Sequence, residues 1–148
     1  GSGLQNAFMR GPRWLRYNQS KLANCAFTAA LHERLQARGS KVKALVAHPG
    51  LANTNLQVTS IKEGGMGKTM TGLFMRMSQS PEDGAMGILS AMCLEDAQSG
   101  QFYGPGAGMM AGKGKAITFD LEPFYDNPET HHLIWEMSSE AVGTTFLA

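Results

Sequence analysis

The sequence has 148 residues, of which 43% are hydrophobic and 17% are charged, and its formal net charge is +1. A chain of this length with this share of apolar residues fits one folded domain, which argues against intrinsic disorder. The nearly balanced charge argues against nucleic acid as a partner, and no apolar run approaches the roughly 18 residues that a membrane span needs.

The first predicted element is a long helix over residues 14–38. This stretch is rich in good helix formers, contains no glycine or proline, and is followed by Gly39 in the position of a C-terminal cap. Its middle is apolar nearly all round, which predicts burial on two sides. We expect one side to face a sheet and the other to face a second helix or a subunit.

A buried strand is predicted next, over residues 42–48. This run is apolar, contains β-branched residues and ends at Pro49-Gly50, as is typical of a strand in a parallel sheet. Residues 51–79 mix glycine, threonine, asparagine and methionine. We interpret them as a substrate-side loop with short helices.

A second helix is predicted over residues 80–97. It starts with Ser80 as the cap, Pro81 at the first helical position and two acidic residues in the first turn. A short strand is predicted over 101–103, and a glycine-rich loop over 104–116.

The last predicted element is a helix at the end of the chain. Asn127, followed by proline and glutamate, is the expected start, and Gly143 is the expected C-terminal cap. The order is therefore long helix, strand, substrate loop, helix, short strand and terminal helix. Helix, glycine turn and strand form the second half of a βαβ unit, which predicts an α/β fold.

The residues most suited to chemistry are Tyr17 and Lys21, near the start of the long helix. Their spacing of four places both on one face, about one turn apart. A phenol titrates near pH ~10, and a nearby ammonium lowers that value. A tyrosine in such a pair can exchange a proton with an alcohol or a carbonyl oxygen. The bare spacing is common in helices, so a surface tyrosine packed against a lysine stem is the alternative.

The neighbours of this pair carry a family resemblance. Residues 17–24 read Tyr-Asn-Gln-Ser-Lys-Leu-Ala-Asn, which is similar to the Tyr-x-x-Ser-Lys-x-Ala-Asn stretch of the short-chain dehydrogenases/reductases. Residues 48–54 resemble the Pro-Gly-x-x-x-Thr motif of that family, and residues 101–105 resemble its late strand. Residues 133–138 resemble the closing helix of the branch that contains the retinol dehydrogenases.

The resemblance implies the C-terminal part of a Rossmann-type doubly wound parallel sheet. The chain, 1–148, would be a single partial domain without the N-terminal dinucleotide-binding strands. The activity implied is hydride transfer between NAD or NADP and an alcohol or carbonyl. Tyr17 would be the general acid/base, and Lys21 would hold the nicotinamide ribose hydroxyls. The nicotinamide carboxamide and a nearby phosphate would be contacted by the backbone of Pro49, Gly50 and Leu51 and by the hydroxyl of Thr54.

The family's glycine-rich dinucleotide turn lies far upstream of its catalytic tyrosine. We therefore expect the isolated chain to bind no nucleotide and to be inactive. Two interpretations of Ser2 stay open: the family's substrate-orienting serine, or a remnant of a cloning tag. The glycine patterns at 106–111 and 67–69 lack the strand and helix context of a nucleotide-binding loop.

A second interpretation is a non-catalytic module that self-associates. The predicted helices 14–38 and 80–97 are both strongly apolar, and in the resembled family they pair across a two-fold axis into a homodimer. The substrate expected of the parent enzyme is a small apolar alcohol or carbonyl, from the methionines of residues 51–79. Cys25 and Cys93 make no disulfide framework, and there is no signal-peptide pattern, so we expect a cytoplasmic protein. We also expect no metal site.

Overall fold

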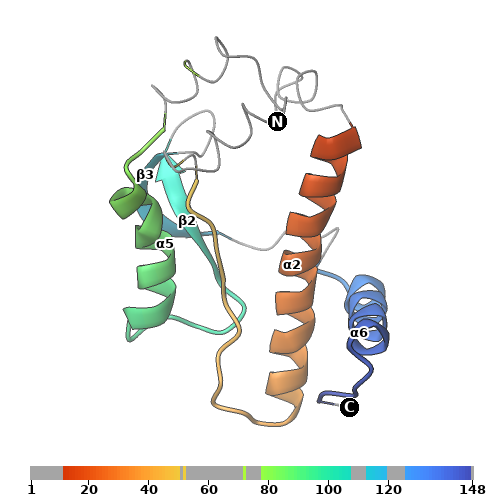
Figure 1. Cartoon of the computed structure of the whole chain (residues 1–148). Helices are drawn as coiled ribbons and strands as arrows, with labels where there is room; N and C mark the ends of the chain where they lie inside the picture. The colour runs from red at the N-terminus through yellow and green to blue at the C-terminus, as the bar shows by residue number, and fades with distance from the viewer. Residues whose placement is uncertain are drawn as a thin grey trace. The chain divides into compact units, whose positions relative to one another are not determined.

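The computed structural model describes residues 12–50, 52, 72, 78–107, 113–119 and 126–147. Within these residues, three helices and three strands have defined bounds, so the chain is a mixed α/β protein (Figure 1). It divides into two compact units. The first unit comprises residues 1–44 and 121–148, and the second comprises residues 45–120.

In the described residues of the first unit, the helices are α2 (Pro12–Ala37) and α6 (Pro128–Val142). Helix α2 confirms the predicted long helix to within two residues at its start and one at its end. Gly39 follows it with a φ of +61°, in the left-handed region that favours glycine. The Gly39 N–H donates to the Gln36 carbonyl at 2.9 Å and so satisfies one of the last carbonyls of the helix.

Helix α6 confirms both of its predicted ends. The Asn127 side chain accepts a hydrogen bond from the Thr130 N–H at 3.0 Å, and Pro128 occupies the first helical position. Gly143 ends the helix with a φ of +67°. These ends were predictable because each depends on residues within one helical turn.

An aromatic contact holds α6 against α2. Trp135 is only 5% exposed, and its ring stacks on Phe27 of α2 with the ring centroids 5.3 Å apart and an interplanar angle of 8°. The Arg34 guanidinium lies 4.3 Å from the centroid of the Trp135 ring, within cation–π range. Phe146, beyond the end of α6, lies 6.2 Å from the same ring. Trp135 is therefore the main anchor between these two helices.

A polar contact fixes the same pair of helices. His131 of α6 is 8% exposed, and its Nδ1 lies 2.8 Å from Oε2 of Glu33 in α2. Its Nε2 lies 3.3 Å from Oδ1 of Asp126 but makes no hydrogen bond. Asp126 thus lies within ion-pair distance of the imidazole but is not aligned for a hydrogen bond. Glu33 is the partner that orients the imidazole.

The second unit is a three-stranded sheet in the order β1-β2-β3 with helix α5 against it. Strand β1 (Val46–Ala47) pairs in parallel with β2 (Phe102–Ala107), with Val46 opposite Phe102. Strand β2 pairs antiparallel with β3 (Lys113–Phe119). Helix α5 (Pro81–Cys93) lies beside the sheet (Figure 1), and its buried residues are Gly84, Gly87 and Ala91.

Two sequence predictions need correction here. The sheet is mixed, not wholly parallel, and residues 104–107 and 113–116 belong to β2 and β3, where a glycine-rich loop was predicted. Glycine and proline have low strand propensity, so their presence obscured this hairpin. The residues between the two strands lie outside the described part of the chain.

Two predicted boundaries were also too wide. Helix α5 ends at Cys93, not at residue 97, because Leu94 takes an extended backbone with a ψ of 128°. The predicted strand 42–48 is paired only at its end, where the His48 N–H donates to the Tyr103 carbonyl at 2.9 Å. None of the described helices is long and apolar enough to cross a membrane.

Candidate functional site

The predicted catalytic pair lies on one face of α2, as the spacing required. Lys21 Nζ lies 5.4 Å from the centroid of the Tyr17 ring, and Tyr17 is 46% exposed. The Ser20 hydroxyl, between them in the motif, donates to the Tyr17 backbone carbonyl at 2.7 Å. Ser20 is therefore engaged with the helix backbone, and the side chains of Tyr17 and Lys21 lie exposed on one face of α2.

The predicted cofactor-binding turn lies in the second unit, directly after β1. Gly50 has a φ of +63°, a conformation that suits glycine. Its N–H donates to Nδ1 of His48 at 3.0 Å, and the Pro49 carbonyl accepts from the Gln79 side-chain amide at 2.8 Å. The polar backbone groups nearest the bend are thus already used within the chain.

Gln79 was not singled out in the sequence. Its residue is only 6% exposed, and its Oε1 accepts from the Gly114 N–H of β3 at 3.2 Å. The buried Gln79 amide therefore links the Pro49 carbonyl, 30 residues before it, to Gly114 of β3, 35 residues after it. No local sequence signal marks this role, because both partners are distant in sequence.

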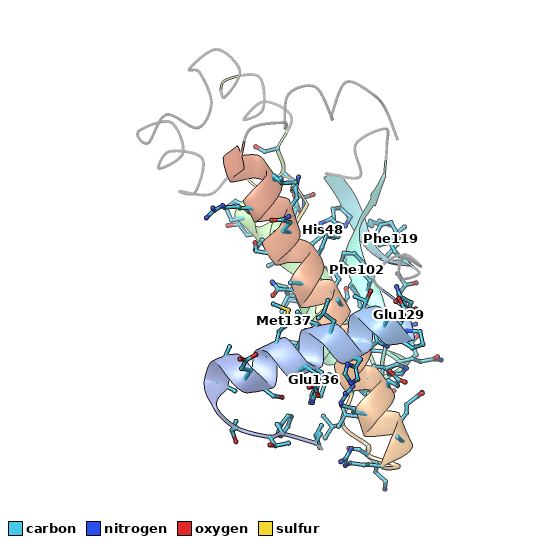
Figure 2. All side chains as sticks on the ribbon, turned by 90° about the vertical axis from the view of Figure 1, so that its right-hand side faces the viewer. His48, Phe102, Phe119, Glu129, Glu136 and Met137 are labelled. Carbon is cyan, nitrogen blue, oxygen red and sulfur yellow. The ribbon has the colours of Figure 1, made fainter. Side chains whose placement is uncertain are left out.

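His48 lies among aromatic rings at the end of β1. The rings of Phe102 and Phe119 lie 5.2 and 6.3 Å from the imidazole, and Figure 2 shows all three together. Burial lowers the pKa of His48 below its ordinary value. The neutral imidazole is thus favoured, which suits an Nδ1 that accepts a hydrogen bond.

Because Gly104 of β2 has no side chain, the His48 imidazole can occupy the space next to its backbone. A Cβ at this position would overlap Nε2 and Cδ2 of His48. We expect Gly104→Ala to lower the free energy of unfolding by about 1–3 kcal/mol, the usual effect of overpacking. Urea unfolding followed by circular dichroism measures it. Gly72→Ala is the control, since a Cβ there meets nothing within 4 Å. Equal effects of the two substitutions would contradict the packing of His48 on Gly104.

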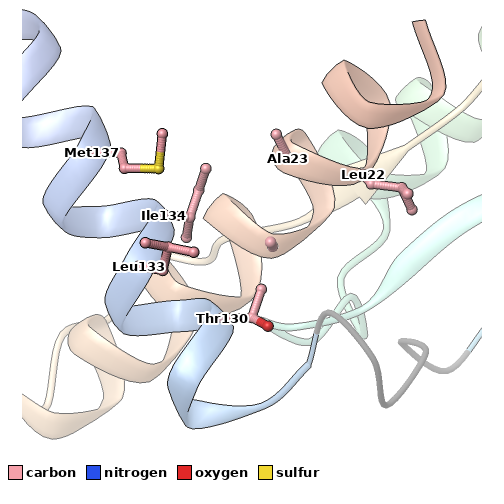
Figure 3. Close-up of a pocket in the computed structure, with 7 residues that line it drawn as sticks. Leu22, Ala23, Thr130, Leu133, Ile134 and Met137 are labelled. Atoms are coloured by element: carbon pink, nitrogen blue, oxygen red, sulfur yellow. The ribbon is translucent and has the colours of Figure 1, made fainter. Parts of the chain in front are cut away.

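An apolar groove lies between α2 and α6 in the first unit. Its volume is about 240 Å³, and Figure 3 shows side chains of the two helices on its opposite walls. The lining residues are Leu22, Ala23, Ala26, Thr130, Leu133, Ile134 and Met137. Leu133 and Met137 are 60% and 58% exposed, so the groove is open to solvent.

The remaining predicted residues have different positions. Leu51, Thr54 and Ser2 lie outside the described residues, as do the glycine pattern at 67–69 and most of that at 106–111. Tyr17 and Lys21 belong to the first unit, and Pro49 and Gly50 belong to the second. In the described part of the chain, no group of three or more histidine, cysteine, aspartate or glutamate side chains could hold a metal ion.

Comparison with known proteins adds a structural likeness. No model of a protein family matches the sequence, and no curated protein matches it. The crystal structure of an uncharacterised protein from Mycobacterium paratuberculosis is similar, with 29% sequence identity and a TM-score of 0.59. The match covers 90% of this chain and 40% of that protein, so the chain spans less than half of its length. The name of that protein states no activity.

Proposed function

We propose that this chain supplies the catalytic half of an NAD(P)-dependent short-chain dehydrogenase/reductase. The observation that supports this most is the placement of the Lys21 ammonium 5.4 Å from the Tyr17 ring centroid on α2. The surrounding Tyr-x-x-Ser-Lys-x-Ala-Asn pattern adds to it. A chance pair of exposed residues would not bring that pattern with it.

In the proposed reaction the chain's own residues handle the proton. As a phenolate, Tyr17 takes the hydroxyl proton of an alcohol as the substrate carbon loses its hydride; in the reverse direction the phenol gives that proton to the carbonyl oxygen. When bound, the nicotinamide supplies the hydride acceptor or donor. Lys21 suits the ribose hydroxyls because its ammonium carries three donors on a flexible stem.

The rest of the cofactor site is proposed more coarsely. The Gly50 carbonyl and the residues that follow it, Leu51 and Thr54, would face the nicotinamide carboxamide and the nearby phosphate. The adenosine half of NAD or NADP would be held by a Rossmann-type half of the sheet outside this chain. The similar protein, of which this chain matches 40%, is long enough to carry such a half. We therefore expect the isolated chain to be inactive.

Deuterium transfer tests this proposal. The chain is joined to the Rossmann-type half that the proposal requires and mixed with NAD⁺ or NADP⁺ and small apolar alcohols deuterated at the carbinol carbon. We expect deuterated nicotinamide nucleotide by mass spectrometry, and none when Tyr17 is replaced by phenylalanine. Absence of transfer across the alcohols and the corresponding reverse reactions would overturn the proposal.

A second candidate function is self-association, which an exposed apolar surface favours. Five large apolar side chains of α5 and its C-cap are between 46% and 77% exposed: Met86, Ile88, Leu89, Met92 and Leu94. An apolar surface of this kind on a helix is typical of a protein–protein interface. A second copy of the chain is the occupant we propose, with α2 and α5 forming the interface of a homodimer.

Sedimentation velocity at micromolar concentration tests the homodimer. We expect Met92→Lys to weaken association at least about tenfold, because the interface would then have to bury an unpaired ammonium. His132→Lys, which adds the same charge to an exposed position on α6, should leave association unchanged. A wild-type chain that stays monomeric would remove this function.

A further inference from the structure

The turn after β1 is held by two side chains, and one of them can take up a proton. We propose that His48 is the positioning residue of the Pro49–Gly50 turn and holds it only while its Nδ1 is unprotonated. Any effect of His48 on nicotinamide binding rests on the proposed function. The hydrogen bond between His48 and Gly50 does not depend on that function.

The first step is the hydrogen bond itself. The Gly50 N–H lies 3.0 Å from Nδ1 of His48, and an N–H can only donate. Nδ1 must therefore present its lone pair, which places the ring proton of the neutral imidazole on Nε2. Once Nδ1 is protonated, two donors face each other and the bond to Gly50 is lost.

The second step is that the ring has little room to turn away. Its face and edge are packed against Phe102 and Phe119, at 5.2 and 6.3 Å between centroids. On a further side lies Gly104, where even a Cβ would overlap the ring. A protonated His48 therefore cannot keep its packing and avoid Gly50 at the same time, so the turn has to move.

The third step concerns what remains after protonation. Gln79 still binds the Pro49 carbonyl at 2.8 Å, and its own Oε1 still accepts from Gly114. A glutamine does not titrate, so this second hold is independent of pH. We expect protonation to release the Gly50 side of the turn while the Pro49 side stays attached to β3.

The surroundings of His48 fix the direction of the pH effect. Among the described residues, the rings of Phe102 and Phe119 and the backbone of Gly104 lie against the imidazole, and Gly87 of α5 lies near the His48 backbone carbonyl; each of these groups is uncharged. Burial is the cause of its lowered pKa. Because the folded state disfavours the proton, stability contributed by His48 falls as the pH drops below the unfolded value of ~6.5, and stops falling below the folded pKa.

Two substitutions separate the hydrogen bond from the proton. Asparagine at position 48 can accept from the N–H two residues further on, as in an Asx turn, but it does not titrate. Phenylalanine keeps an aromatic ring and removes the acceptor. Nitrogen-15 NMR of the whole chain follows the His48 ring and the Gly50 amide from pH 8 to pH 5.

In the wild type we expect the Gly50 amide signal to shift with His48 and its hydrogen exchange, corrected for intrinsic pH dependence, to rise by about tenfold in acid, the scale of one lost hydrogen bond. His48→Asn should keep the amide protected at every pH, and His48→Phe should leave it unprotected throughout. Equal protection of Gly50 in the wild type and in His48→Phe would overturn the proposal.

The two proposals fail in different measurements. The Gly50 amide signal could shift with the protonation of His48 while no deuterium transfer depends on Tyr17. That result would support the positioning role of His48 and contradict the dehydrogenase function. Where transfer occurs, the KM for the nucleotide should rise in acid in the wild type more than in His48→Asn, with a smaller change in kcat. An identical rise in both proteins would overturn the link between His48 and the nicotinamide.

Discussion

Replacing Tyr17 by phenylalanine is expected to lower the turnover number for hydride transfer by about 10²–10⁴-fold, the usual contribution of a general acid or base. The substitution removes only the phenolic oxygen. Tyr17 is 46% exposed on α2, so losing this oxygen should leave the free energy of unfolding nearly unchanged. Steady-state rates with alcohol and NAD⁺ or NADP⁺, measured on the chain joined to the Rossmann-type half that the proposed function requires, give the effect.

Ser20→Ala is the matched control for this substitution. It removes a hydroxyl three residues away on the same helix, where the Ser20 oxygen is bonded to the Tyr17 backbone carbonyl at 2.7 Å. We expect its turnover to stay within a few-fold of the wild type. If Tyr17→Phe and Ser20→Ala behave alike, the proton passes through another group, and the pair on α2 is only a packed tyrosine and lysine.

The helix ends were predictable because their signals are local. Ser80 caps α5 by accepting from the Asp83 N–H at 3.1 Å, and Asn127 caps α6 in the same way. Gly39 and Gly143 adopt the positive φ that their positions after a helix require. Each signal needs only residues within one turn of the helix. The same reason explains why the Tyr17–Lys21 contact followed from spacing alone.

The sheet was less predictable because its pairing is not local. Strand β1 pairs with β2 some 56 residues later, as Val46 opposite Phe102 shows. Strand β2 contains two glycines and a proline, and its propensity therefore indicates a loop. Packing overrides that propensity at Gly106, where the space of a missing side chain is filled by Ile117 of β3. The small residues that obscured the hairpin are thus the ones that permit its close packing.

The supporting residues of the site were hidden for the same reason. Gln79 joins groups 30 residues before it and 35 residues after it, and His131 meets Glu33 across 98 residues. Such contacts arise only when the elements pack. The hydrogen bond from the Gly50 N–H to His48 likewise depends on the aromatic packing that holds the imidazole, so the sequence did not show it.

Replacing Trp135 by alanine is expected to lower the free energy of unfolding by about 3–5 kcal/mol, the range for removing a buried large aromatic side chain. The ring is 5% exposed, stacks on Phe27 at 5.3 Å and carries the Arg34 guanidinium at 4.3 Å. Its loss leaves a cavity between α2 and α6 and exposes Phe27. Urea unfolding followed at 222 nm measures the change.

Two further variants of α6 show whether the ring itself is the anchor. Trp135→Phe keeps an aromatic surface for Phe27 and Arg34 and should destabilise less than Trp135→Ala. Met137→Ala removes a side chain that is 58% exposed in the groove, and should change the free energy of unfolding by only about 0.5 kcal/mol. If Met137→Ala destabilises as much as Trp135→Ala, the helices are held by the groove residues and not by the aromatic stack.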